Sequence, residues 1–209
     1  MTRPINKDDL ARAAKNLARK IPQFKPILDR FGVPPLWDRP AGFATLIYII
    51  LEQQVSLASA KATYDKLLQK LGKINPQNFL TLSDAELKNI GFSRQKTGYC
   101  RVVARQITEG NLKLDLLNKM PDIDVKNRLM AIKGIGHWTS DIYLLMVLRR
   151  PDVWPHGDRA LAVAAYEVFN MNDIPEYSLL QRLADSWKPW RSVAARLLWQ
   201  HYLNTSRKK

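Results

Sequence analysis

The sequence predicts an all-α protein, on three observations. Apolar residues recur at helical spacing along almost the whole chain of 209 residues. No convincing run of β-branched residues alternates with polar ones, as a half-buried strand requires. Glycines, prolines and helix-capping residues interrupt the apolar pattern at short intervals, which indicates many short helices. The expected helices lie near residues 7–19, 23–31, 41–52, 56–71, 83–89, 94–109, 122–131, 137–149, 159–170, 176–186 and 190–204.

Local signals mark several of these helix ends. Ser83 begins a Ser-Asp-Ala-Glu pattern that finishes at Glu86, which is a capping box and predicts a helix start. Gly72, Gly91 and Gly110 follow helical patterns, where a residue in the left-handed conformation commonly ends a helix. Prolines lie near expected helix starts or in connections at Pro22, Pro76, Pro121, Pro155 and Pro175.

Two proline-containing segments divide the chain. Gly32–Pro35 and Pro151–Pro155 separate a central piece, residues 36–154, from flanks at residues 1–35 and 155–209. We expect the central piece to form one helical lobe, which includes the segment near residues 122–149 discussed below. We expect the two flanks to pack together as a second lobe.

Charge and cysteine content restrict the class of function. Lys and Arg number 33 against 19 Asp and Glu, so the net charge is +14 and a polyanion such as nucleic acid is the expected partner. The single cysteine, Cys100, excludes a disulfide framework and cysteine-held zinc or iron–sulfur sites. The N-terminus lacks the apolar core of a signal peptide, and no apolar run approaches the roughly 20 residues of a membrane span. We therefore expect a cytoplasmic protein, nucleoid-associated if it is bacterial.

The most informative segment is Leu129–Leu145, LMAIKGIGHWTSDIYLL. Gly134 and Gly136 lie between two helical patterns, and glycine permits both a tight turn and a close backbone approach to a ligand. A helix N-terminus at this turn can bind phosphate without reading base sequence. Lys133 and His137 flank the turn. The alternative is a plain connection between two helices, but the basic chain favours binding to the DNA backbone.

Asp158 follows this segment, in the loop Trp154–Arg159, WPHGDR. Pro155 and Gly157 oppose an earlier helix start, so Asp158 is expected at or near a helix N-cap. There the helix dipole and the free N–H groups favour its negative charge. The alternative interpretation is that Asp158 only caps the helix.

A hairpin, a second helix and then a loop that ends in aspartate resemble the signature of the helix-hairpin-helix DNA glycosylases. The resemblance covers about residues 36–205 and implies two helical lobes with a DNA-binding cleft between them. It implies that Asp158 is the catalytic carboxylate. Gln53 and Gln54 resemble the residues that these enzymes insert into the duplex, and the alternative is two polar residues at a helix end. The resemblance assigns DNA-backbone binding to Lys133, Gly134, Ile135, Gly136, His137 and Thr139.

A second match narrows the resemblance to one branch. The segment Trp187–Ser192, WKPWRS, together with Trp199, is similar to the C-terminal segment of the bacterial alkylation-inducible 3-methyladenine DNA glycosylases. In that family, tryptophans that match Trp138 and Trp199 line the base pocket, and a role in the core is the alternative for Trp199. The family's pocket tyrosine matches Ile142 here, with Tyr143 adjacent, which leaves the preferred lesion open.

The resemblance also implies a reaction. Members of the superfamily that cut the strand carry a nucleophilic lysine where this chain has Trp138, so a monofunctional enzyme is implied. It would rotate a damaged nucleotide out of double-stranded DNA and hydrolyse the N-glycosidic bond of alkylated purines of the 3-methyladenine or 7-methylguanine type. We expect a monomeric catalytic core that lacks the family's N-terminal β domain and requires no cofactor. The family hairpin implies a Na⁺ or K⁺ ion held by the main-chain carbonyls of Met130, Ile132 and Ile135.

Two other functions are not excluded by the residues. One is a bifunctional glycosylase and lyase for oxidised bases, which the missing lysine disfavours. The other is a non-catalytic helix-hairpin-helix module that binds DNA, which the presence of Asp158 disfavours.

Overall fold

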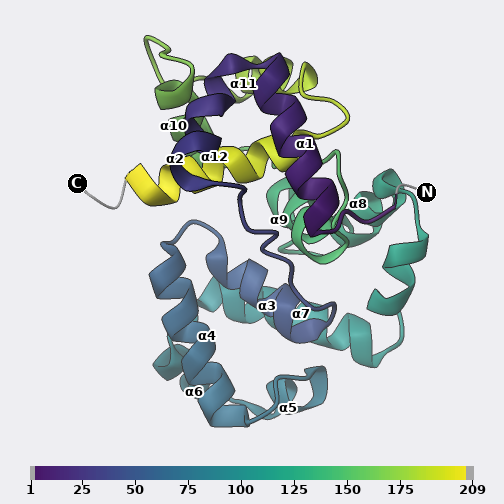
Figure 1. Ribbon diagram of the computed structural model, residues 1–209. Coiled ribbons are helices and arrows are strands. Elements are labelled where there is room, and N and C mark those ends of the chain that lie inside the picture. The colour runs from purple at the N-terminus through teal and green to yellow at the C-terminus, as the bar shows by residue number, and fades with distance from the viewer. Residues whose placement is uncertain (1–2, 206–209) are drawn as a thin grey trace. The chain divides into compact units, whose positions relative to one another are not determined.

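The computed structural model describes residues 3–205. Within that range every regular element is a helix and none is a strand, which confirms the all-α prediction (Figure 1). None of these helices is long and apolar enough to cross a membrane. In chain order the elements are α1 (Lys7–Lys20), η1 (Pro22–Phe24), α2 (Lys25–Phe31), α3 (Phe43–Glu52), α4 (Leu57–Leu71), α5 (Pro76–Thr81), α6 (Asp84–Ile90), α7 (Arg94–Thr108), η2 (Leu114–Lys119), α8 (Asp122–Met130), α9 (His137–Ile142), η3 (Tyr143–Val147), α10 (Arg159–Val168), α11 (Tyr177–Asp185) and α12 (Arg191–Thr205).

The structure departs from the expected helices in two respects. The sequence analysis does not predict α5 or η2, because each is six residues long, too short to show a helical period. Helix α5 also begins directly on Pro76, after a side-chain cap from Asn75. The single helix expected over residues 137–149 is α-helical only to Ile142, and it widens into the π-helical segment η3.

The predicted capping signals are confirmed. The Ser83 hydroxyl accepts a hydrogen bond from the Glu86 backbone N–H at 3.2 Å, and the Glu86 carboxylate accepts one from the Ser83 N–H at 2.9 Å. Gly72 and Gly91 cap the C-termini of α4 and α6 with positive φ angles of 66° and 117°. These caps satisfy backbone groups that a helix end otherwise leaves unpaired.

The described chain forms two compact units. The first unit is Arg39–Tyr143, and the second combines residues 3–38 with residues 144–205. These boundaries differ from those expected after residues 35 and 154. The end of the expected C-terminal flank, residues 206–209, lies outside the described residues.

Residues 144–154 belong to the second unit because they are bonded to α12. The Ser192 hydroxyl accepts a hydrogen bond from the Val153 N–H at 2.9 Å. The Arg191 guanidinium pairs with the Asp152 carboxylate, also at 2.9 Å. The segment Pro151–Pro155 is thus part of the packed second unit.

Helix α3 lies at the centre of the first unit. Eight of its ten residues are buried, and it packs against α4, α7 and α9. Ile49 and Ile50 have no exposed surface. The buried carboxylate of Glu52, at the end of the helix, pairs with Arg39 at 2.7 Å. Helix α3 therefore holds the loop that follows it in a defined place.

Helix α12 lies at the centre of the second unit. Nine consecutive residues, from Ser192 to Gln200, are buried, and the helix packs against α1, α2, α10 and α11. Just before it, Trp187 is 1% exposed, and its ring lies against Phe24 at 5.4 Å and Trp154 at 5.2 Å. Aromatic packing of this kind stabilises the unit through burial of apolar surface and through favourable contacts between the rings.

A buried arginine on α12 connects three segments of the second unit. Arg196 has no exposed surface, and its guanidinium donates to the carbonyls of Leu36, Leu145 and Ser192 at 2.9–3.0 Å. Burial lowers the pKa of Arg196 from 12.5 to about 9, and Asp38 opposes the shift, so the side chain is charged at neutral pH. The guanidinium therefore satisfies carbonyls from three segments of the chain.

The single thiol is expected to be unreactive in the folded protein. Cys100 is fully buried on α7, and burial raises the pKa of its thiol well above the ordinary range, with Lys96 as a small opposing influence. Because the thiolate is the reactive form, raising the pH from 7 to 9 should not start its reaction with a disulfide reagent such as DTNB. The control is the same protein in denaturant, which should react fully. Rapid reaction of the native protein would show that α7 opens readily.

Candidate functional site

The glycine turn of the first unit forms the predicted hairpin between α8 and α9. Gly134 has a φ of +98°, and Gly136 is the N-cap residue of α9 without a capping side chain. Ile135 is buried, and its N–H donates to the Ile132 carbonyl at 3.0 Å. Lys133, Gly136 and His137 are exposed. The start of α9 thus presents backbone N–H groups and a lysine at the surface, an arrangement suited to a phosphate.

Gly134 is required at its position by its neighbour on α7. A Cβ atom at residue 134 would lie 2.1 Å from Cγ of the Tyr99 ring, closer than any real contact. The positive φ angle adds a second reason for glycine. The ring of Tyr99 therefore packs directly against the backbone of the hairpin at Gly134, a contact that the sequence analysis does not predict.

Gly134→Ala is expected to lower the free energy of unfolding by about 2–4 kcal/mol, through overpacking against Tyr99 and the strain of a positive φ. The matched control is Gly98→Ala, one residue from Tyr99 on α7, where a Cβ meets nothing within 4 Å. That substitution should stabilise by about 0.5–1 kcal/mol. Urea unfolding of both variants measures the difference. Equal stabilities would contradict the packing of Tyr99 on the hairpin.

Of the two glutamines predicted for duplex insertion, Gln53 is bonded to the hairpin and Gln54 is exposed. The Gln53 amide donates to the Gly134 carbonyl at 2.9 Å and to the Thr139 hydroxyl at 2.8 Å, so it joins the end of α3 to the hairpin. Thr139 is 1% exposed. Gln54 is exposed and has a φ of +55°. The next exposed residue along the loop is Val55, an apolar side chain that the sequence analysis does not single out.

Helix α9 carries Trp138 and Ile142 of the predicted pocket residues, and Tyr143 follows as the first residue of η3. Trp138 is half-buried, whereas Ile142 and Tyr143 are 1% and 0% exposed. Burial raises the pKa of the Tyr143 hydroxyl to about 12. On the same helix the buried Asp141 carboxylate pairs with Lys126 of α8 at 2.7 Å. This ion pair fixes the two helices of the hairpin to each other.

The predicted catalytic aspartate lies in the second unit, at the start of α10. Gly157 has a φ of +67°, and Asp158 then takes the N-cap position, which confirms the expected cap. Its Oδ1 accepts a hydrogen bond from the Leu161 N–H at 2.9 Å. The same oxygen accepts one from the indole Nε1 of Trp199 at 3.3 Å. The structure therefore brings together two residues that the sequence analysis singled out separately.

A third residue, the aromatic Trp37, joins this pair. Its ring lies 6.4 Å from that of Trp199, at an interplanar angle of 72°. Trp37 is half-buried, and its φ of +47° is unusual for a large side chain. The sequence analysis missed it because the only local signal is the preceding Pro34 and Pro35, which indicate a connection.

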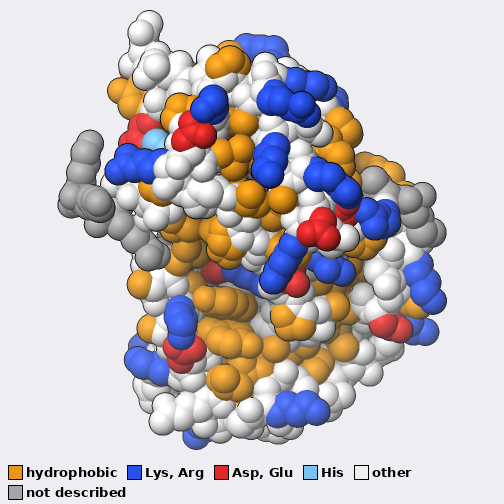
Figure 2. Space-filling model, in the orientation of Figure 1, with side chains coloured by type: hydrophobic (Ala, Val, Ile, Leu, Met, Phe, Trp, Pro, Cys, Tyr) orange, Lys and Arg blue, Asp and Glu red, His pale blue; other side chains and the backbone are white. Residues whose placement is uncertain are grey.

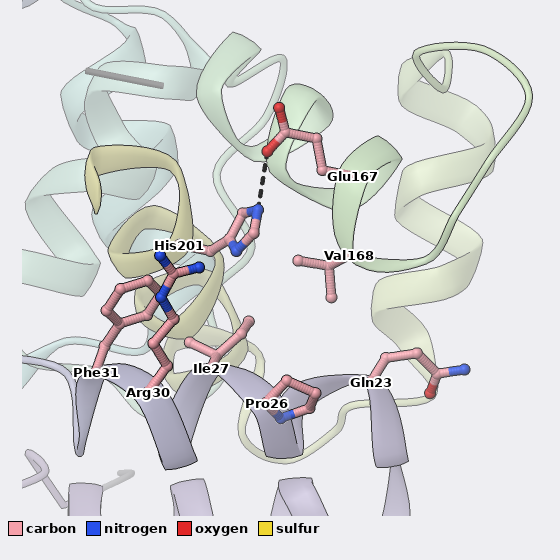
Figure 3. A pocket seen from close by; sticks show the side chains of 8 residues that line it. All are labelled: Gln23, Pro26, Ile27, Arg30, Phe31, Glu167, Val168 and His201. Atoms are coloured by element: carbon pink, nitrogen blue, oxygen red, sulfur yellow. Dashed lines mark hydrogen bonds and ion pairs between the residues drawn. The ribbon is translucent and has the colours of Figure 1, made fainter. Parts of the chain in front are cut away.

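Neither the surface charge nor the pocket of the second unit singles out the candidate sites. Lys and Arg side chains are spread over the visible face of the molecule, with few acidic side chains among them (Figure 2). One pocket of about 210 Å³ lies at the other end of α10 from Asp158, where Glu167 pairs with His201 at 2.8 Å (Figure 3). Its lining contains none of the predicted site residues.

Comparison with known proteins gives consistent matches. The HhH-GPD model, described as a superfamily of base excision DNA repair proteins, matches residues 47–190. A Bacillus subtilis (strain 168) protein named DNA-3-methyladenine glycosylase is 28% identical over 181 residues, which cover 81% of this chain. The alkylbase DNA glycosidase-like protein mag2 of Schizosaccharomyces pombe is 26% identical over 204 residues, or 94% of this chain and 96% of that protein.

A solved structure agrees with these relatives. The DNA-3-methyladenine glycosidase from Bacillus halodurans is 28% identical and superposes with a TM-score of 0.76, covering 94% of this chain and 91% of that one. The chain spans only 61% and 58% of the lengths of two Bacillus subtilis relatives that it matches.

Proposed function

The chain belongs to the HhH-GPD superfamily of base excision DNA repair proteins, and from this premise we propose that it is a DNA glycosylase of the 3-methyladenine type. Its substrate is double-stranded DNA that contains alkylated purines. The reaction is hydrolysis of the N-glycosidic bond, which releases the free base and leaves an abasic site. The relatives named for this activity support the proposal.

The observation that carries the proposal is the held carboxylate of Asp158. One oxygen bonds both the N-terminus of α10 and the indole of Trp199, so an anion and an electron-rich ring are kept side by side. As the N-glycosidic bond breaks, its electron pair leaves with the base and positive charge develops on the sugar. We assign stabilisation of that charge to Asp158. Water supplies the oxygen that bonds to C1′ of the sugar and releases a proton to solvent.

The charge of the damaged base explains the assigned substrate class. A purine alkylated at N3 or N7 is cationic, so it leaves without first being protonated. A cation is also attracted to the face of an indole ring. We assign this attraction to Trp199, beside Asp158. A role for Trp138, Ile142 and Tyr143 in base recognition stays a prediction from the family resemblance.

We assign the grip on DNA to the hairpin and the loop after α3. The exposed Lys133 and the backbone at Gly136 and His137 are suited to one phosphate group. Of the two glutamines, the exposed Gln54 is assigned to the gap left by the rotated nucleotide. Gln53 is assigned to hold the loop on the hairpin, because its amide is bonded to Gly134 and Thr139.

A monovalent cation at the hairpin is also part of the proposal. The carbonyls of Met130, Ile132 and Ile135 lie within the six residues that lead into the hairpin, and the Ile132 carbonyl accepts a hydrogen bond from the Ile135 N–H at 3.0 Å. A carbonyl oxygen has a second lone pair, which suits a hard cation. A bound cation would add positive charge where the phosphate binds. Replacing K⁺ with Li⁺ at constant ionic strength should then weaken binding to an abasic duplex.

The test of the function is the release of free bases from methylated duplex DNA, analysed by chromatography. Release of 3-methyladenine or 7-methylguanine is expected, with no protein–DNA adduct after borohydride reduction, because Trp138 replaces the lysine that forms a Schiff base. An adduct trapped on DNA with oxidised bases would instead establish a glycosylase and lyase. Salt-sensitive DNA binding without any base release would establish a binding module.

A further inference from the structure

We propose that Trp37 is a second aromatic wall of the Asp158 site and contacts the damaged base before its release, favouring purines that carry a positive charge while attached to the sugar. This inference rests on the glycosylase function proposed above and deepens it by naming a residue that selects the substrate. Trp37 lies in the connection between α2 and α3, outside any helix. Three features of the second unit carry the argument.

The first feature is a strained backbone that is held from outside. Trp37 has a φ of +47°, a left-handed conformation in which Cβ crowds the following carbonyl. Bulky residues persist in this conformation only where surrounding contacts impose it. Here the carbonyl of the preceding residue, Leu36, accepts a hydrogen bond from the buried Arg196 at 2.9 Å. The same guanidinium is anchored on Leu145, also at 2.9 Å.

The second feature is where this backbone directs the indole. The ring of Trp37 meets Trp199 at 6.4 Å and 72°, and Trp199 donates to Asp158 at 3.3 Å. Trp199 follows Arg196 on α12 at a spacing that places both on one side of the helix. The residue that holds Leu36 is therefore a neighbour of the residue that Trp37 contacts. The strained backbone therefore brings a second aromatic ring to Trp199, whose indole is bonded to the carboxylate.

The third feature is exposure. Trp154 and Trp187 of the same unit are 5% and 1% exposed, and Trp199 is 8% exposed. Trp37 is half-buried. A core role does not require a tryptophan that is both strained and partly open to solvent. Partial exposure beside Trp199 is what a base-contacting wall requires.

The chemistry follows from two neighbouring electron-rich rings, one of which is bonded to the Asp158 carboxylate. Indole attracts cations more strongly than the rings of tyrosine or phenylalanine do. N3- and N7-alkylated purines are cations, so loss of the Trp37 ring should slow their release by about 2- to 30-fold. Binding of product DNA without a base should not change, because nothing is then stacked on Trp37.

The experiment compares Trp37→Gly, Trp37→Phe and Trp37→Tyr with the wild type. Glycine removes the ring and tolerates the positive φ, whereas phenylalanine and tyrosine keep a weaker ring. Two quantities are measured: the single-turnover rate of 7-methylguanine release, and the affinity for a duplex with a tetrahydrofuran abasic-site analogue. The expected rates fall from Trp to Tyr and Phe and then to Gly, with unchanged affinity for the abasic duplex. Trp190→Phe is the matched control, a half-buried tryptophan of the same unit, and should leave both quantities unchanged.

Each outcome decides the inference. Equal release rates in all variants, or a parallel loss of release and abasic-duplex affinity, would show that Trp37 only packs. If Trp37→Gly does not fold, as judged by circular dichroism, the Phe and Tyr variants decide by the same two quantities. A wild-type protein that releases no 7-methylguanine overturns the proposed function itself and the inference with it. An active wild type with insensitive variants overturns the inference alone.

Discussion

Asp158→Asn should lower the rate of base release by about 100- to 1,000-fold, the usual effect of removing one preorganised electrostatic group from an active site. Asparagine has nearly the same size and caps helices as well as aspartate does, so the bond to the Leu161 N–H can persist. The substitution therefore removes negative charge without removing the cap. The measurement is single-turnover release of methylated purines, together with the affinity for an abasic duplex, which should be retained.

Two further variants separate charge from structure at this position. Asp158→Ala removes both the charge and the cap, so it should lose the same activity and about 1 kcal/mol of stability. Glu167→Gln removes a carboxylate from the opposite end of α10 and should leave base release unchanged. If Asp158→Asn kept more than a third of the wild-type rate, Asp158 would be a cap and not the catalytic carboxylate.

Arg196→Met is expected to cause the largest loss of stability, about 2–5 kcal/mol. Methionine can fill the space but cannot donate, so the buried carbonyls of Leu36 and Leu145 lose their partner, at about 1–3 kcal/mol each. Relief from burying a charge offsets part of this cost. Arg196→Lys should recover little, because one ammonium group cannot reproduce a planar fork that reaches several carbonyls. Urea unfolding measures both variants.

The control for Arg196 is Arg182→Met on α11, an exposed arginine in the same unit. Its effect should stay within about 0.5 kcal/mol, as at most surface positions. A similar small effect for Arg196→Met would mean that water replaces the guanidinium at both carbonyls. The hydrogen bonds of Arg196 would then not be what holds Leu36 in place.

The fold was largely predictable because its signals are local. Ser83 and Glu86 specify a helix start by their own hydrogen bonds, and Gly72 specifies a helix end by its own conformation. The elements that escaped prediction, such as α5 and η2, are too short for a repeating pattern. The boundary of the second unit escaped for another reason. This boundary depends on the hydrogen bond between Val153 and Ser192, which are far apart in the chain. No local sequence pattern near either residue predicts that bond.

In the candidate site, too, the local features were predictable from the sequence and the contacts between distant residues were not. The N-cap position of Asp158 follows from the proline and glycine before it, and the structure confirms it. The bond between Asp158 and Trp199 joins distant positions, although a family resemblance singled out each residue. Trp37 had neither a local pattern nor a matching motif. The inward orientation of Gln53 was equally hidden, because its partners on the hairpin are far along the sequence.

The attachment of the hairpin to its surroundings limits its use as a portable part. The turn rests on the ring of Tyr99 from α7, and it is bonded to Gln53 from the end of α3. A synthetic peptide that contains only α8, the turn and α9 would lack both supports. Transplanting the turn into another protein would therefore also require an aromatic side chain in the place of Tyr99 and an amide in the place of Gln53. The same dependence constrains sequence change, because a substitution in the hairpin, at Tyr99 or at Gln53 affects the contacts of the other two.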